Sequence, residues 1–223
     1  MKQIIKIIFL VLLFTSCDLK SSLDYYNLAV TLSEQGKNKE AIEMLNKAIS
    51  KDPKFIKAYI NRGAYKSDLG CYEDAIKDYK EVVKINPKNI LALVNIGCNY
   101  KRLKDNKMAI KYFNKALELK GDGPLYLSFS PNFMDNSENY DVPAHEIFYE
   151  RGIAFYSIDS LEQAYYDFKT AINNNYMIAD CYCRIGYIYL STRNNELAKD
   201  FFRKSKQLGD RIAEDELRKR FNE

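Results

Sequence analysis

The segment Glu40-Ala41-Ile42-Glu43-Met44-Leu45-Asn46-Lys47-Ala48-Ile49 carries the pattern that decides the fold of this chain. Its apolar residues recur three and four positions apart, and the same holds for DAIKDYKEVVKI at residues 74–85. This spacing collects apolar side chains on one face of a helix, so both segments are predicted to be amphipathic helices. The second segment begins 34 residues after the first, which indicates an internal repeat.

Two further sets of residues follow the interval of 34, with one longer step of 55 between their third and fourth members. One is a set of alanines that begins with Ala41 and Ala75 in the two segments, and the other is a set of small residues that lie twelve positions before these alanines. The alanines are Ala41, Ala75, Ala109, Ala164 and Ala198, and the small residues are Ala29, Gly63, Gly97, Gly152 and Gly186. Because glycine inside a helix costs about 1 kcal/mol relative to alanine, four glycines in one register predict a close approach of two helix axes.

These positions resemble the tetratricopeptide repeat, a helix-turn-helix unit of 34 residues. The resemblance divides the chain into repeats over 22–55, 56–89, 90–123, 145–178 and 179–212, numbered first to fifth below. At its twenty-fourth position the family has a bulky residue, which here is Leu45, Tyr79, Phe113, Phe168 or Phe202. The resemblance implies an all-α fold, an α-α superhelix of about five repeats, because one repeat alone cannot bury its apolar face.

Such an array needs a polar cover at its end, and the last residues are predicted to supply it. The segment 210–223 can form a helix with Ile212, Leu217 and Phe221 on its inner side, and we assign 213–223 as the capping helix. The run Arg218-Lys219-Arg220 is interpreted as a solvated last turn that the helix dipole favours. A basic docking site is the alternative.

The repeat register is interrupted by 21 residues at 124–144, PLYLSFSPNFMDNSENYDVPA. Three prolines rule out a long regular helix there, but the aromatic residues are too many for a typical disordered linker. We expect either an ordered insertion that packs across the repeats or a local loop that caps helix ends. Long loops in compact domains are often functional.

The chain begins with the features of an export signal. Lys2 and Lys6 precede an apolar run over residues 7–14, and small residues then lead to Cys17. The run is too short to span a bilayer, which needs about 20 apolar residues. The order Leu13-Phe14-Thr15-Ser16-Cys17 resembles the lipobox of bacterial lipoproteins, although Phe14 stands where leucine is usual. The resemblance implies removal of 1–16, lipidation of Cys17 and a short tether over 17–21, hence an exported protein anchored in the bacterial envelope. A plain signal peptide or a buried N-terminal helix is the alternative.

Charge and cysteine content exclude several functions. The chain has 34 Lys and Arg against 30 Asp and Glu, and loss of Lys2 and Lys6 leaves a formal charge of +2. No dense basic run argues for nucleic acid. The spacing of Cys71, Cys98, Cys181 and Cys183 suggests neither a disulfide framework nor a zinc site. We therefore predict no metal, no cofactor and no nucleic-acid partner.

In this family the first helix of each repeat lines the concave surface of the superhelix, so the resemblance implies a groove for a partner peptide or helix. Its fifth, sixth and ninth positions are tyrosines, aliphatic residues and asparagines, with Glu and Arg in the later repeats. The predicted groove residues are Tyr26, Asn27, Val30, Ile60, Asn61, Val94, Asn95, Tyr149, Glu150, Ile153, Arg184 and Tyr187. A polar surface ladder is the alternative for the asparagines. The family's carboxylate clamp is not expected, because Tyr26 and Val30 stand where it needs Lys and Asn.

These features predict a non-enzymatic scaffold or adaptor that holds a protein or peptide near the membrane and assists envelope-complex assembly or localisation. No phosphate-binding glycine loop, nucleophile elbow or zinc-protease motif occurs in the sequence. One rival is an enzyme or enzyme subunit with a site at 124–146, built around Asp141, His145 and Glu146. Another is a soluble exported inhibitor or immunity-type binder.

Overall fold

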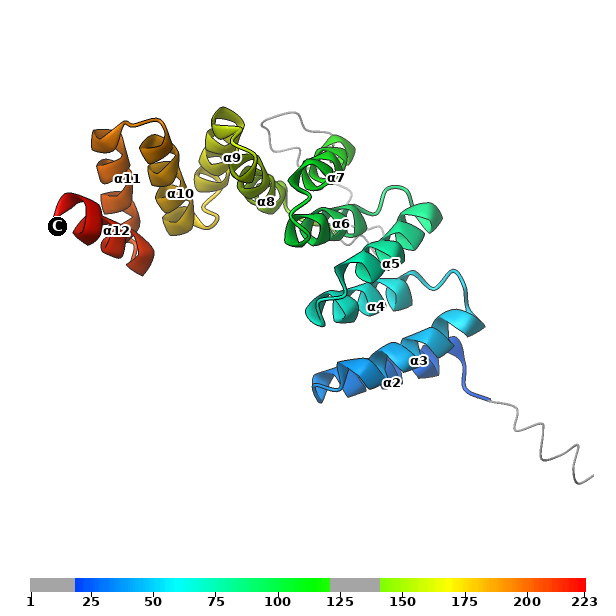
Figure 1. Cartoon of the computed structure of the whole chain (residues 1–223). Coiled ribbons are helices and arrows are strands. Elements are labelled where there is room, and N and C mark those ends of the chain that lie inside the picture. The colour runs from blue at the N-terminus through cyan, green and yellow to red at the C-terminus, as the bar shows by residue number, and fades with distance from the viewer. Residues whose placement is uncertain (1–18, 121–140) are drawn as a thin grey trace, which may run out of the picture. The chain divides into compact units, whose positions relative to one another are not determined.

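The computed structural model describes residues 19–120 and 141–223, which form eleven α-helices and no strand (Figure 1). The helices are α2 (Ser22–Glu34), α3 (Asn38–Lys51), α4 (Ile56–Asp68), α5 (Tyr72–Ile85), α6 (Ile90–Arg102), α7 (Asn106–Leu119), α8 (Ala144–Ser157), α9 (Leu161–Asn173), α10 (Ile178–Ser191), α11 (Asn195–Gln207) and α12 (Arg211–Phe221). Within the described ranges, no helix combines the length and hydrophobicity that crossing a bilayer requires. The predicted signal peptide, Cys17 and residues 124–140 of the predicted insertion lie outside the described residues.

The residues that begin and end the helices follow local rules. Ser21 begins α2 with a capping box, in which its hydroxyl accepts from the Asp24 amide at 3.1 Å and its own amide donates to the Asp24 carboxylate at 2.8 Å. In each of the five repeats, the turn between the two helices contains a residue with positive φ at the fifteenth position. These residues are Gly36, Gly70, Lys104, Asp159 and Arg193. The last three repeats therefore place an ordinary side chain where glycine would be free of strain.

The helices pack with their neighbours in sequence, and the chain divides within α4 into two compact units. In the first unit, which ends at Tyr65, α2 packs on α3 around Ala29, Leu45 and Ala48, whose side chains are completely buried. In the second unit, Lys66–Glu223, each of the pairs α6/α7, α8/α9 and α10/α11 forms a helical hairpin (Figure 1). The pairs stack through α5/α6, α7/α8 and α9/α10 contacts, so apolar surface that one hairpin leaves uncovered is buried by the next.

The close approach expected at the repeated glycines is present in the third, fourth and fifth repeats. A Cβ atom added to Gly97 would lie 2.6 Å from Cε1 of Phe113, and one on Gly186 would lie 2.8 Å from Cε1 of Phe202. Gly152 stands in the same relation to Phe168, at 2.9 Å. All three phenylalanine rings are completely buried. The glycines therefore make room for an aromatic ring of the second helix.

Helix α12 packs on α11 through a face that differs from the predicted one. Ala213 and Leu217 are buried and Phe221 packs against them, whereas Ile212 is 59% exposed. The prediction for Ile212 is thus wrong. Residues 213, 217 and 221 are four apart and share one face of a helix, and Ile212 is turned about 100° away from Ala213. Arg218, which lies 3.7 Å from Asp215, faces solvent.

The chain leaves the interruption of the repeats close to the end of α7. Lys120 pairs with the Asp141 carboxylate and donates to the Val142 carbonyl at 2.8 Å. Val142 is buried in the core cluster that α6, α7 and α8 share, and Pro143 then caps α8. These contacts fix the register in which the fourth repeat starts.

Candidate partner-binding surface

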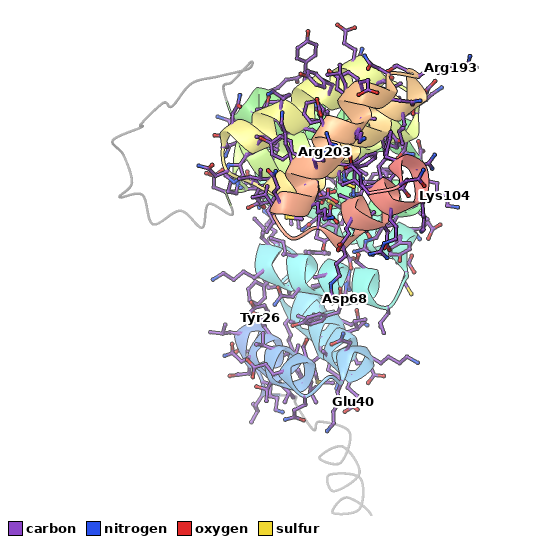
Figure 2. All side chains as sticks on the ribbon, turned by 90° about the vertical axis from the view of Figure 1, so that its left-hand side faces the viewer. Tyr26, Glu40, Asp68, Lys104, Arg193 and Arg203 are labelled. Carbon is purple, nitrogen blue, oxygen red and sulfur yellow. The ribbon has the colours of Figure 1, made fainter. Side chains whose placement is uncertain are left out.

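In the first unit, the predicted groove residues lie on α2 and α4. The Asn61 side-chain amide donates to the Tyr26 hydroxyl at 3.2 Å, and the Tyr26 ring lies 5.2 Å from that of Phe55 (Figure 2). Asn27 is exposed and Val30 is half-buried. The structure thus joins groove residues of the first two repeats, which stand 35 positions apart in the sequence.

In the second unit, the predicted residues lie on α6, α8 and α10 and are linked by polar contacts. Lys101 near the end of α6 forms an ion pair with Glu150 of α8. The Tyr149 hydroxyl donates to Asp180 at 2.8 Å, and Arg184 pairs with the same carboxylate. The Arg184 guanidinium also lies 5.8 Å from the centroid of the Tyr149 ring, within the range of a cation–π interaction.

Burial separates the predicted groove residues into two groups. The fifth-position residues Ile60, Val94 and Tyr149 are only 6%, 7% and 8% exposed, so they belong to the packing between helices. The fifth-position residue of the first repeat, Tyr26, is half-buried. The sixth- and ninth-position residues keep part of their surface accessible. The half-buried ones are Val30, Asn61, Asn95, Glu150, Ile153, Arg184 and Tyr187. A ligand on the first helices of the second unit would meet Asn95, Glu150, Ile153, Arg184 and Tyr187 first.

Three residues that the sequence analysis did not select contribute to this surface. Lys101 and Asp180 neutralise the predicted residues Glu150 and Arg184. Tyr176, between α9 and α10, packs its ring 5.6 Å from that of Tyr149. The Asp180–Arg184 pair has helical i, i+4 spacing and was detectable in the sequence, whereas Lys101 and Glu150 are 49 positions apart.

The titratable groups of this surface are held in their uncharged or paired forms. Burial raises the pKa of Tyr149, and the hydrogen bond to Asp180 adds to the shift. Burial, with the nearby Glu216, raises the pKa of Tyr187 to about 12. Burial also raises the pKa of Cys98 and of Cys183 to about 12. These thiols are therefore protonated at neutral pH, and a thiol is a weak nucleophile and a weak metal ligand.

Two of the residues around which the rival enzyme site was predicted, Asp141 and His145, contact different residues. Asp141 pairs with Lys120. The His145 ring lies 5.0 Å from the ring of Tyr176. Among residues 19–120 and 141–223, no group of three or more His, Cys, Asp and Glu side chains is placed to hold a metal ion. The described contacts therefore give the enzyme hypothesis no support.

Two family models, both described as tetratricopeptide repeat, match this chain. One matches residues 23–55 and 56–89, and the other matches 90–122 and 179–208. The matches together cover more than half of the chain. They leave out 145–178, where α8 and α9 form a helical hairpin like the others.

Several solved structures share the fold. MamA from Desulfovibrio magneticus RS-1, from residue 41 on, superposes with a TM-score of 0.70 at 16% identity, covering 84% of this chain and 94% of that one. YrrB, described as a TPR protein with an unusual peptide-binding site, has a TM-score of 0.66 at 19% identity and coverage of 86% and 89%. PilF from Pseudomonas aeruginosa has a TM-score of 0.66 at 18% identity and coverage of 90% and 82%. A comparison with curated protein sequences finds no match. The predicted all-α superhelical fold class is confirmed.

Proposed function

Because the chain belongs to the tetratricopeptide repeat family, we propose that it is a non-enzymatic adaptor that binds a partner peptide or helix on the first-helix surface. This surface is formed by the accessible residues of α6, α8 and α10 defined above. The fold class and its solved relatives support a protein-interaction scaffold. The position of the ligand on the first helices is our inference for this chain.

The observation that carries the proposal is the pairing of charges within the surface. Glu150 and Arg184 are already neutralised by Lys101 and Asp180, so a ligand finds few unpaired charges there. It meets the half-buried side chains of Ile153 and Tyr187 and the amide of Asn95 instead. Such a mixture suits the apolar face of a peptide or amphipathic helix, with a few polar contacts that set its orientation.

The Tyr187 ring is held in place before any ligand binds. It packs against the Phe202 ring at 5.2 Å with an interplanar angle of 80°. A side chain that is already ordered loses little conformational entropy on binding, and tyrosine is enriched among residues that dominate interface energies. We expect Tyr187 to be an anchoring residue.

A double substitution tests the binding surface. We expect Ile153→Asp with Tyr187→Ala to weaken binding of partners captured from an envelope extract by at least about tenfold, since losing one anchoring residue costs about 2 kcal/mol or more. Captured proteins are identified, and their affinities for both forms are measured by titration calorimetry. The control is Tyr166→Ala, because Tyr166 is 61% exposed on the second helix α9. Equal affinities for the double variant and the unchanged chain would contradict the proposal.

We further propose that lipidated Cys17 anchors the chain in the bacterial envelope, facing the periplasm or the cell surface. The support is the order of residues 13–17 after a basic start and an apolar run. Two membrane signals or several acyl chains make such anchoring stable, as each buried CH₂ contributes about 0.8 kcal/mol. An anchored adaptor would hold its partner near the membrane and assist assembly or localisation of an envelope complex.

Metabolic labelling tests the anchor. Cells expressing the chain should incorporate radiolabelled palmitate, and Cys17→Ala should abolish the label completely. Cys71→Ala is the matched control, because Cys71 is an exposed cysteine in the described part of the chain. If the label persists in Cys17→Ala, the anchor is excluded and an exported but soluble binder becomes the better description.

A further inference from the structure

We propose that the outer face of α7 is a basic surface that binds the headgroups of anionic phospholipids. Lys107, Lys111 and Lys115 are exposed and stand four residues apart, which places them on one side of the helix. We call these three residues the α7 lysine stripe. Lys104, in the turn before α7, is also exposed (Figure 2).

The same three positions carry mixed side chains in the other repeats. They are Lys39, Glu43 and Lys47 on α3; Glu73, Lys77 and Glu81 on α5; Glu162, Tyr166 and Thr170 on α9; and Glu196, Asp200 and Lys204 on α11. Only α7 has lysine at all three. Like charges at i and i+4 each destabilise a helix by about 0.2–0.5 kcal/mol. The stripe contains two such pairs, so it lowers helix stability and calls for a reason outside the helix.

The described residues do not neutralise the stripe. On α5, Lys77 pairs with Asp74 at 2.7 Å and Lys84 pairs with Glu81 at 2.5 Å. Across residues 19–120 and 141–223, Lys107, Lys111 and Lys115 form no ion pair. The single acidic residue within α7 is Glu118, the penultimate residue of the helix. The stripe therefore presents unneutralised positive charge to its surroundings.

The chemistry of the stripe favours a bilayer surface over a shaped ligand. Lysine is a compact point charge on a flexible stem and makes no bidentate contact, unlike the arginine fork that reads individual phosphates or carboxylates. The helical rise sets the stripe at about 12 Å in length. Tyr112, which follows Lys111 on the same helix, is stacked on Tyr100 at 5.6 Å, and Phe113 is completely buried. Within α7, therefore, no ring is free for the base stacking that single-stranded nucleic acid needs.

The expected gain in affinity for an anionic bilayer is large enough to measure. A lysine close to an anionic membrane contributes about 1 kcal/mol, so three lysines correspond to about a hundredfold in partition between bilayer and water. The attraction falls off within a Debye length, about 8 Å at physiological salt. It needs neither lipid on Cys17 nor a protein partner, and its failure would leave both earlier proposals standing.

Vesicle sedimentation tests the proposal with the full-length, unlipidated chain. We expect tighter binding to vesicles of phosphatidylglycerol and phosphatidylcholine than to phosphatidylcholine alone, with the difference lost at high salt. Both vesicle types offer the same hydrocarbon to the apolar N-terminal run, so the difference reports on charge. The triple variant Lys107→Gln, Lys111→Gln and Lys115→Gln should reduce binding to the anionic vesicles about a hundredfold.

The control variant removes the same number of charges from other second helices. Lys39→Gln, Lys77→Gln and Lys84→Gln changes three exposed lysines of α3 and α5 and should keep most of the binding. Circular dichroism confirms that both variants are folded. An equal loss in the two triple variants would show that net charge alone acts and would overturn the proposal. Tighter binding to an acidic peptide or a DNA oligonucleotide than to vesicles would assign the stripe to another partner and overturn it as well.

Discussion

Replacing Arg151 with methionine should destabilise the fourth repeat by about 3–5 kcal/mol, because it leaves the buried carboxylate of Asp167 without its charge partner. Nε and Nη2 of Arg151 donate to the two oxygens of Asp167 at 2.8 Å each, and Nη1 donates to the Asn114 side chain at 2.7 Å. Asp167 is only 4% exposed. This one guanidinium therefore ties α8 to α9 and to α7. Amide hydrogen exchange of α8 and α9 reports the loss locally, as neighbouring repeats can open separately.

The loss of stability caused by Arg151→Met should become smaller at acidic pH. Burial raises the pKa of Asp167 above its ordinary value, and the hydrogen bonds from Arg151 act against that shift. Without Arg151 the pKa rises further, so between the ordinary and the raised pKa the folded form binds more protons than the unfolded form. The free energy of unfolding then increases as the pH falls through this window. Unfolding should be measured at neutral pH and again near the ordinary pKa of aspartate. We expect the free energy of unfolding of the variant to be closer to that of the unchanged chain at the lower pH.

Two controls separate the effect of the unpaired Asp167 carboxylate from the effect of lost packing around Arg151. The double variant Arg151→Met with Asp167→Leu should recover most of the stability, since apolar residues of similar volume often replace a buried ion pair at little cost. Arg203→Met removes a partner of the exposed Glu223 and should cost no more than about 1 kcal/mol. A double variant as unstable as Arg151→Met would refute the explanation by an unpaired Asp167.

Gly97→Ala should destabilise the third repeat by up to about 2 kcal/mol, although alanine is the better helix former. The added Cβ would lie 2.6, 2.9 and 3.0 Å from three atoms of the Phe113 ring. That ring is completely buried in the shared core cluster and has no free space to enter. Overpacking of this kind costs about 1–3 kcal/mol, which equals or exceeds the gain of about 1 kcal/mol in helix propensity. Urea unfolding followed by circular dichroism measures the result.

The first repeat shows how the same position can accept alanine. Ala29 and Leu45 occupy the places of Gly97 and Phe113, and both are completely buried. In a chain that already carries Phe113→Leu, adding Gly97→Ala should therefore be neutral or stabilising by up to about 1 kcal/mol. The effect of one substitution changes sign with the residue opposite it, which a double-mutant cycle detects as a coupling energy. An equal loss in both backgrounds would rule out the ring contact as the cause.

Much of the architecture was determined by local sequence pattern. The 34-residue register predicted helical hairpins around Ala41 and Ala109 and a close approach at Gly97, Gly152 and Gly186, as the structure has it. Such predictions succeed because helical periodicity decides which face of a segment is apolar, and that decision needs only a few neighbouring residues. The prediction for Ile212 failed because Ala213, about 100° away on the helix, lies on the buried face although it offers a weaker apolar signal than isoleucine.

Only the tertiary structure decided which residues of the candidate surface are buried and which are accessible to a ligand. The spacing placed Val94, Tyr149 and Ile153 alike on the first helices, but stacking of the repeats buries the first two and leaves the third half-exposed. The partners of Glu150 and Asp167 likewise depend on which helices meet. Burial and ion pairing depend on contacts between residues far apart in the chain. A repeating local pattern does not specify them, because it is the same whichever helix packs against it.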